Sequence, residues 1–363
     1  MTKLKQLIND LCPNGVEYKS LENCCIILDN KRKPVTKSMR ESGEYPYYGA
    51  NGIQDYVSNY IFEGTFVLVG EDGSVITPNG KPVVTWATGK IWVNNHAHII
   101  SEKDGVLLRY LYHFLQTVNV KPLIHGNIPK LTGKDFKAVQ IPVPPLEIQC
   151  EIVRILDNFT ELTAELTAEL TARKQQYAYY QKKMLNFAAN IPKLLLSDVA
   201  VGVFSGKNKE RLEDGTYPVY GSTGVIASTD TPVYNWEQIL VARVGANAGY
   251  VHLAKGQYDV SDNTLIVNVK KEYSLKFVYY ILTSMNLNQY AKGGGQPLIT
   301  AGDLKKMPIP MPERDVQDRI VAVLDNFNAI CTDLSSGLPA EIEARQKQYE
   351  YYRDKLLTFT PAD

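Results

Sequence analysis

The sequence predicts an α+β protein in which two diverged globular domains alternate with two long helices. Two observations carry this prediction: the chain contains an internal duplication, and each copy includes a long stretch with the apolar periodicity of a helix. The 363 residues provide for two or three domains, and 44% hydrophobic with 21% charged residues is typical of globular proteins.

The duplication is clearest in two blocks. Residues 141–159 and 309–327 both open with an Ile-Pro-x-Pro segment and are identical at about half of their positions. Residues 172–185 and 344–357 share the pattern Ala-Arg-x-x-Gln-Tyr-x-Tyr-Tyr. Weaker matches precede these blocks, among them a Tyr-Pro-x-Tyr-Gly-x-x-Gly segment in each half. The chain therefore repeats one plan, a globular unit followed by a helix.

The first copy predicts one continuous helix. Between Leu146 and Phe187 apolar residues recur every three or four positions, and neither glycine nor proline interrupts them. Pro144 and Pro145 suit the entrance, because a proline there lacks only an N–H group that has no helical partner. At 1.5 Å per residue, this helix would be roughly 60 Å long.

The second copy predicts a similar helix with a break. Its apolar stripe runs from Val316 to Leu334 and resumes at Ile342, and the segment between its two blocks is four residues longer. Gly337 and Pro339 lie in that longer segment and predict the break. Because two long amphipathic helices most simply bury their stripes against each other, we predict an antiparallel coiled-coil pair with a pseudo-twofold axis between the halves.

The globular parts predict mixed strands and short helices. Strands bounded by glycine and asparagine turns are expected at residues 65–69, 91–93, 239–242 and 264–269. Short helices are expected at residues 107–117 and 275–285. The resulting divisions are residues 1–145 for the first globular domain, 146–189 for the central helix, 190–312 for the second globular domain and 313–363 for the distal helix.

The sequence shows no catalytic constellation. Residues 202–207 resemble a phosphate-binding loop but are one residue short, so a turn is favoured. Glu17 and Lys19 have the spacing of a nuclease metal-and-lysine pair, a match that chance often produces. His96 and His98 could ligate a metal, yet the second copy lacks histidines there, which favours a polar-core or surface role.

Charge and cysteine content narrow the possible classes of protein further. The chain carries 39 basic and 39 acidic residues, but the two helical stretches are acidic, which leaves 28 basic and 23 acidic residues in the globular parts. Five cysteines without CxxC spacing argue against a disulfide framework or a zinc site. Since no leader or membrane-spanning run is evident either, a cytoplasmic protein is expected.

These repeats are similar to those of one family. The whole chain resembles the specificity (S) subunit of type I restriction–modification systems, through its Ile-Pro-x-Pro entries, its Ala-Arg-x-x-Gln-Tyr-x-Tyr-Tyr blocks, its Tyr-Pro-x-Tyr-Gly-x-x-Gly turns and residues 337–342. The resemblance implies two target-recognition domains, a central and a distal helical region, and a non-catalytic subunit that reads a bipartite, asymmetric DNA target. It also implies two methyltransferase (M) subunits that use S-adenosylmethionine for adenine N6 methylation, and motor-nuclease (R) subunits that use ATP and Mg²⁺. No cofactor or metal is expected in this chain.

Basic loops and polar turns of the globular parts are the expected contacts to double-stranded DNA. The expected phosphate contacts are Lys31, Arg32, Lys33, Lys207 and Lys209. The residues expected to face a groove are Tyr48, Asn51, Asp72, Ser74, Asn94 and Asn95 in the first domain, and Ser222, Thr223, Arg243, Asn247, Asn263 and Gln296 in the second. Two other interpretations stay open: a duplicated coiled-coil scaffold that binds proteins rather than DNA, and an independent nuclease that uses Glu17 and Lys19.

The central helix contains two identical tetrapeptides. Thr163, Ala164, Glu165 and Leu166 are followed by Thr167, Ala168, Glu169 and Leu170. Each TAEL repeat adds about 6 Å of rise and a net rotation near 40°, so the leucines stay on one broad face. The repeats are therefore a helical spacer. Our hypothesis is that their number sets the gap between the two half-sites, by roughly one or two base pairs per repeat.

Overall fold

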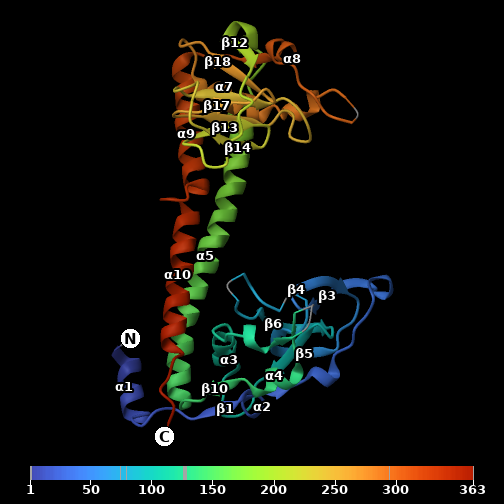
Figure 1. Cartoon of the computed structure of the whole chain (residues 1–363), viewed down its shortest axis with the longest axis vertical. Helices are drawn as coiled ribbons and strands as arrows, with labels where there is room; N and C mark the ends of the chain where they lie inside the picture. The colour runs from blue at the N-terminus through green and yellow to red at the C-terminus, as the bar shows by residue number, and fades with distance from the viewer. Residues whose placement is uncertain (1, 74, 79, 126–128, 294, 363) are drawn as a thin grey trace. The chain divides into compact units, whose positions relative to one another are not determined.

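The computed structural model describes residues 2–73, 75–78, 80–125, 129–293 and 295–362. The chain divides into two compact units. The first comprises Met1–Leu166 together with Glu341–Asp363, and the second comprises Thr167–Ala340. Each unit contains β-sheet, several short helices and a part of the long helices (Figure 1).

A six-stranded sheet forms the body of the first unit. Its strand order is β2 (Ile26–Ile27), β7 (Ala97–Ser101), β5 (Phe62–Gly70), β6 (Val84–Val93), β3 (Ser42–Gly49) and β4 (Gly52–Val57). Neighbouring strands are antiparallel except β3 and β6, which run parallel with Tyr48 opposite Val93. Because side chains alternate between the faces of a strand, Val67 and Val69 enter one core while Phe66 and Leu68 enter another.

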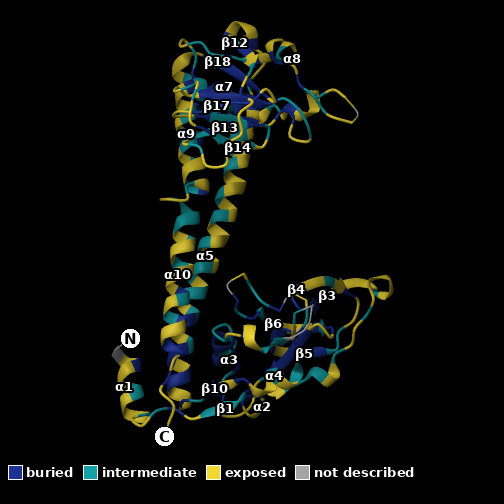
Figure 2. Cartoon of the chain, in the orientation of Figure 1, coloured by how far each residue is buried: buried dark blue, intermediate teal, exposed yellow. Residues whose placement is uncertain are grey.

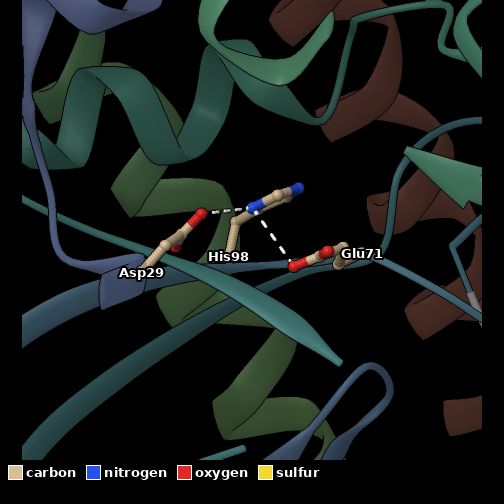
Figure 3. Close-up of side chains that lie close together, drawn as sticks. All are labelled: Asp29, Glu71 and His98. Atoms are coloured by element: carbon tan, nitrogen blue, oxygen red, sulfur yellow. Dashed lines mark hydrogen bonds and ion pairs between the residues drawn. The ribbon is translucent and has the colours of Figure 1, made fainter. Parts of the chain in front are cut away.

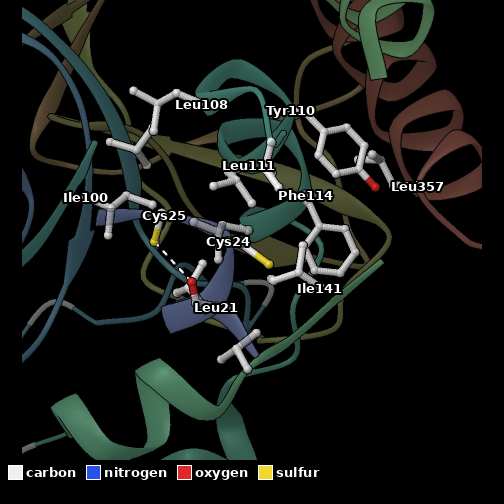
Figure 4. Packing of buried hydrophobic residues seen from close by; sticks show 14 of the residues in the cluster. Leu21, Cys24, Cys25, Ile100, Leu108, Tyr110, Leu111, Phe114, Ile141 and Leu357 are labelled. Atoms are coloured by element: carbon white, nitrogen blue, oxygen red, sulfur yellow. Dashed lines mark hydrogen bonds between the residues drawn. The ribbon is translucent and has the colours of Figure 1, made fainter. Parts of the chain in front are cut away.

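The larger core of the first unit lies between this sheet and its helices. Helices α2 (Leu21–Cys24), α3 (Leu108–Leu115) and α4 (Gly133–Ala138) contribute to it, as do the start of α5 (Leu146–Met184) and the end of α10 (Leu338–Leu356). Cys24 and Cys25 belong to this core, together with Tyr110, Leu111 and Leu357 (Figure 4). All five cysteines are free thiols, and burial raises the pKa of Cys25 to about 12, so its thiol stays protonated.

The second unit repeats this plan with two smaller sheets. One sheet has the order β12 (Ala200–Ser205), β18 (Thr264–Val269), β15 (Gln238–Ala242) and β16 (Val251–Ala254). The other has the order β14 (Gly224–Thr229), β13 (Tyr217–Gly221) and β17 (Asp259–Val260). Strands β13 and β17 are parallel, with Tyr220 opposite Val260, and so repeat the pairing of β3 with β6. The predicted strands and short helices are confirmed. Residues 275–285, for example, correspond to α7 (Leu275–Ser284).

The remaining elements are short. In the first unit they are α1 (Thr2–Leu11), β1 (Tyr18–Ser20), β8 (Ile124–His125), β9 (Lys130–Leu131), β10 (Gln140–Pro142) and three 3-10 turns, η1 (Asp29–Lys31), η2 (Lys37–Met39) and η3 (Lys121–Leu123). In the second they are β11 (Lys193–Leu195), α6 (Leu196–Val199), η4 (Leu287–Tyr290), α8 (Ala301–Lys305) and β19 (Pro308–Pro310). The antiparallel pair β1 and β10 corresponds to β11 and β19.

The long helices form the predicted antiparallel pair. Helix α5 has 39 residues and packs against α10 in the first unit, where Phe159 stacks on Tyr352 with ring centroids 5.4 Å apart. In the second unit α5 packs against α9 (Arg314–Thr332), and Tyr180 stacks on Phe327 at 5.6 Å. The two ring pairs are counterparts in the duplication, so each unit packs its part of α5 against the distal helix through the same kind of ring contact.

The break between α9 and α10 comes earlier than expected. Leu334 is 78% exposed, so the prediction that it extends the apolar stripe is wrong. The cause is Asp333, whose carboxylate accepts hydrogen bonds from the Ser335 amide at 2.8 Å and from the Ser335 hydroxyl at 2.6 Å. These local bonds compete with the helix and turn the chain outward before Leu334 can reach the stripe.

A buried glutamine fixes each long helix to its own domain. Gln149 accepts a hydrogen bond from the Leu107 amide at 2.9 Å and donates one to the Pro144 carbonyl at 2.8 Å. In the second unit, Gln317 accepts from the Ser274 amide at 2.9 Å and donates to the Pro312 carbonyl at 2.8 Å. Both helix entrances therefore use the same bonds.

A carboxylate makes a second attachment, with different partners in the two units. Asp157 binds Arg109 at 2.8 Å and His113 at 2.8 Å. Its counterpart Asp325 binds Lys276 at 2.6 Å and Tyr280 at 2.6 Å. Of these two attachments, only the first contains a histidine.

His113 should make the first unit sensitive to mild acid. It is fully buried between Asp157 and Tyr349, whose hydroxyl lies 2.9 Å from its Nδ1, and burial lowers the pKa of His113 despite the bond to Asp157. The unfolded chain then binds a proton near pH 6.5 that the folded unit does not bind. The free energy of unfolding therefore stays the same above that pH. Below pH 6.5 it decreases as the pH falls, by at most about 1.4 kcal/mol per pH unit.

The substitution His113→Tyr, which installs the residue of the second unit, should flatten this dependence between pH 7 and pH 5. Urea unfolding at both pH values measures it. Tyr280→Phe is the matched control, because it removes a hydrogen bond to Asp325 without changing a group that titrates in this range. If His113→Tyr kept the acid dependence of the wild type, the assignment to His113 would be wrong.

Candidate nucleic-acid interface

In the first unit, several of the expected contact residues lie where β3 and β6 end side by side. The Asn94 amide donates to the Tyr48 carbonyl at 3.0 Å, and the Asn94 side chain donates to Gln54 at 3.2 Å. Tyr48 and Asn94 are buried and support the turn between β3 and β4. Asn51 in that turn and Asn95 after β6 are exposed, so these two can reach a ligand directly.

A second polar group adjoins this one. Asp72, half-buried after β5, is hydrogen-bonded to His96, which is exposed. The Nζ atom of Lys130 lies 4.0 Å from the Asp72 carboxylate and 3.3 Å from that of Glu71. Sequence reasoning missed Lys130, although it lies in a segment, residues 126–132, that has a weak counterpart in residues 294–300 of the second half. Ser74 lies outside the described residues.

Arg32 is bound inside the domain rather than presented on its surface. Its guanidinium donates to the Glu71 carboxylate at 2.6 Å and to the Ala97 carbonyl at 2.7 Å, and its side chain is 12% exposed. Asp29 is bonded to His98 at 2.6 Å (Figure 3). Arg32 was expected to bind a phosphate; instead its donors neutralise two partly buried carboxylates.

The same cluster is a geometric candidate for a metal site. One ligand atom each from Asp29, Glu71 and His98 lies within 4.8 Å of the others. Arg32 and Lys130 already supply positive charge to these carboxylates, and the second ring nitrogen of His98 faces the Leu131 carbonyl at 3.0 Å. The arrangement therefore fits an ion-pair network, in agreement with the polar-core role expected for His98.

Four of the expected phosphate contacts are exposed. Lys31 and Lys33 lie on the loop that follows β2, and Lys207 and Lys209 follow β12 in the second unit. Within the described part of the chain, none of these four lysines forms an ion pair. They are therefore available to a polyanion, unlike Arg32.

In the second unit, the expected residues lie on four loops. Ser222 and Thr223 form the turn between β13 and β14, Asn263 precedes β18, and Asn247 and Gln296 are exposed on the loops after β15 and η4. Arg243 directly follows β15 and is half-buried.

The two domains share a backbone frame but place different side chains on it. The Glu71 amide donates to the His96 carbonyl at 2.8 Å, and the Arg243 amide donates to the Asn263 carbonyl at 2.9 Å. The next hydrogen bond is repeated as well. The Glu71 carbonyl accepts from the Leu131 amide, and the Arg243 carbonyl accepts from the Ile299 amide. Glu71 and Arg243 therefore hold equivalent positions with opposite charges.

The residues of the nuclease interpretation do not form a site. Glu17 and Lys19 pair with each other at 3.1 Å on the surface. Across the described residues, Asp29, Glu71 and His98 make up the one group with metal-ligand geometry, and Glu17 is not among them. Every helix in the described ranges is too short or too polar to span a membrane.

Comparison with known proteins agrees with this organisation. The family model for the type I restriction modification DNA specificity domain matches residues 13–173 and 196–344. A putative type I restriction enzyme specificity subunit of Haemophilus influenzae is 36% identical over 372 residues, which covers 95% of this chain and 96% of that protein. The Escherichia coli EcoR124I/EcoR124II specificity subunit is 33% identical over 296 residues, covering 71% of this chain and 72% of that protein.

A solved structure has the same fold. The S subunit of the type I restriction–modification system of M. genitalium superposes with a TM-score of 0.62 at 15% identity, covering 94% of this chain and 96% of that one. The family model matches the chain twice, once in each half of the duplication. The chain belongs to the specificity subunits of type I restriction–modification systems.

Proposed function

We propose that each globular domain reads one half of a bipartite double-stranded DNA target, and that the chain directs M and R subunits to it. One observation carries this proposal: the two domains repeat the same backbone frame but place different polar groups at its ends. Glu71 in the first domain corresponds to Arg243 in the second, and His96 corresponds to Asn263. Two readers with one frame and different side chains suit two different half-sites.

The exposed groups support contact with DNA. Asn51 and Asn95 in the first domain, and Thr223 and Asn263 in the second, offer amides and hydroxyls that suit base edges. Exposed lysines after β2 and β12 flank them and suit the phosphates that position a protein on the duplex. In this proposal the partner subunits provide adenine methylation and cleavage, and the complex acts in the cytoplasm.

Binding selection on the reconstituted complex tests the proposal. The full chain is assembled with its M subunits and S-adenosylmethionine and offered a pool of random duplexes. The proposal expects enrichment of a split motif whose halves are separated by a constant gap. An assembled complex that enriches no sequence would support the protein-binding scaffold instead. Magnesium-dependent cutting by the chain alone would support the nuclease interpretation.

The outer face of each long helix has a feature that suits a partner bound twice. Tyr179 and Tyr351 are counterparts in the duplication and are 61% and 59% exposed. Each ring has a lysine four residues later, Lys183 or Lys355, with its Nζ atom 5.9 or 5.5 Å from the ring centroid. We propose that these two pairs contact the two M subunits, because exposed tyrosines often anchor interfaces.

The double substitution Tyr179→Ala with Tyr351→Ala should weaken binding of both M subunits roughly tenfold or more, and each single substitution should weaken one of them. Native mass spectrometry of the complex at decreasing concentration reports the number bound. Tyr290→Ala is the matched control, since Tyr290 is 45% exposed and lies in η4, outside the long helices. An unchanged ratio in the double variant would contradict the assignment.

A further inference from the structure

A small cavity in the first unit has an aromatic floor. Its volume is about 210 Å³, and apolar and aromatic side chains line most of it, among them Met39, Tyr47 and Trp92. Ser58 and Asn59 add polar groups to the wall. Pockets for drug-sized ligands have volumes of about 300–1,000 Å³, so this cavity suits a single ring system rather than a larger molecule.

The floor consists of two rings on one face of the sheet. Tyr47 of β3 is paired with Trp92 of β6, and the two rings stack with their centroids 6.4 Å apart. The next residues of these strands, Tyr48 and Val93, enter a hydrophobic core. Because successive side chains of a strand point to opposite faces, Tyr47 and Trp92 lie on the face away from that core.

The loop that forms the wall is fixed to this floor. The Trp92 indole N–H donates to the Lys33 carbonyl at 2.7 Å, and the Tyr47 hydroxyl accepts from the Val35 amide at 3.0 Å. The Arg40 guanidinium lies over the Tyr47 ring, 4.1 Å from its centroid. The cavity is therefore preformed, whereas Met39 on the same loop is 74% exposed and can cover a bound ring.

The second unit fills the equivalent place with polar groups. Strands β13 and β17 pair as β3 and β6 do, so Asp259 corresponds to Trp92. The Asp259 carboxylate is buried and accepts a hydrogen bond from the Asn208 side chain at 2.6 Å. Asn208 in turn accepts one from Arg211 at 3.0 Å. The aromatic floor is therefore a property of the first domain, which indicates a ligand that this domain binds and its counterpart does not.

Charge and position favour a nucleotide as the occupant. Lys33 and Lys37 on the loop are exposed and suit a phosphate. The Trp92 ring suits stacking, which every base permits, and Asn59 offers a polar group to a base edge. Asn95 of the candidate interface follows Trp92 by three residues, so the cavity is continuous with the surface proposed to contact DNA.

We infer that the cavity holds one unstacked nucleotide of the DNA target, with its base against Trp92 and Met39 and its phosphate beside Lys33. This inference rests on the proposed function and deepens it, because the contacts proposed above leave every base of the half-site paired. Extrusion of a base requires that it be unstacked and unpaired, and it costs least where the base is mismatched. A mismatch at the extruded position therefore favours binding.

A mismatch scan of the selected duplex tests the inference. The complex of the full chain with its M subunits is titrated onto duplexes with one mismatch at each position in turn. The adenines that the complex methylates are left out, because methyltransferases extrude their own target base. At one position in or next to the first half-site, a mismatch should strengthen binding severalfold. A 5-iodouracil at that position should photocrosslink to the peptide that contains Trp92.

Substitutions in the cavity should remove this gain in affinity. Met39→Glu replaces the apolar cover by a negative charge and should abolish the gain, whereas Met39→Leu should keep it. Since Met39 is exposed, both chains should fold as the wild type does. Trp92→Leu should abolish the gain and the photocrosslink. Trp236→Leu is the matched control, because Trp236 is 49% exposed in the second unit, and it should keep both.

The outcomes separate this inference from the proposed function. A selected motif without any position that gains from a mismatch, or a gain that Met39→Glu keeps, would overturn the inference alone. A wild-type complex that selects no sequence would overturn the proposed function as well. If Met39→Glu and Trp92→Leu instead lowered the number of bound M subunits, the cavity would hold a protein side chain and the inference would be wrong.

Discussion

One additional TAEL repeat in α5 is expected to move the complex to targets whose half-sites lie one or two base pairs further apart, with near-complete loss of methylation at the original sites. Four helical residues add about 6 Å, and DNA rises about 3.4 Å per base pair. Since both half-sites must be bound together, a changed spacing cannot be absorbed by rebinding one of them.

The repeats lie where the helix can be lengthened. The fully buried residues of α5 lie between Ile148 and Leu156, whereas Leu166 and Leu170 in the repeats are only half-buried and the glutamates are exposed (Figure 2). The border between the two compact units also falls inside the repeats, between Leu166 and Thr167. An inserted repeat continues the leucine face and leaves the core of each unit unchanged.

Mapping of methylated adenines in cells that carry the lengthened chain measures the gap. The control replaces Glu169 by Gln at the original length, which changes the chemistry of a repeat but not its rise. It should leave the gap as in the wild type. If the lengthened chain methylated sites with the original gap, the spacer hypothesis would be wrong.

Replacing Arg32 by Met is expected to destabilise the first unit by about 3–5 kcal/mol, because it leaves partly buried carboxylates without their counter-charge. Burial alone would raise the pKa of Asp29, but the hydrogen bonds from His98 and the Ile99 amide and the charge of Arg32 outweigh it and lower that pKa. Asp29 is therefore an anion in the folded protein, and so its environment must supply positive charge.

Urea unfolding of the wild type and Arg32→Met at pH 7 measures this loss. Lys31→Met is the matched control. Lys31 is the neighbour of Arg32 in the sequence and its side chain is exposed, so loss of its positive charge should change the free energy of unfolding only slightly. A loss for Arg32→Met no larger than that of Lys31→Met would show that Arg32 is not part of a structural network and is free to bind phosphate.

The order of globular domains and long helices was predictable, because it follows from local patterns in the sequence. The stripe from Ile148 to Met184 predicts α5, and Gly337 and Pro339 predict a break close to where one occurs. Leu334 was misplaced because periodicity alone does not reveal that Asp333 caps a turn.

The candidate site was less predictable, because its side chains meet through tertiary pairing. Arg32 and Glu71 are 39 positions apart and are brought together by the loop after β2 and the end of β5. Composition placed Arg32 among the basic loop residues but could not show that a carboxylate already engages it. The equivalence of Glu71 and Arg243 likewise depends on strand register, which is not visible in the weakly similar parts of the repeat.

Whether this chain selects a bipartite DNA target is decided by single-molecule mapping of methylated adenines across the genome of a host that co-expresses the chain with its M subunit. We expect one split motif, with two different halves and a fixed gap, that disappears when this chain is omitted. New methylation in a single uninterrupted motif, or none from a complex that assembles and binds S-adenosylmethionine, would contradict it.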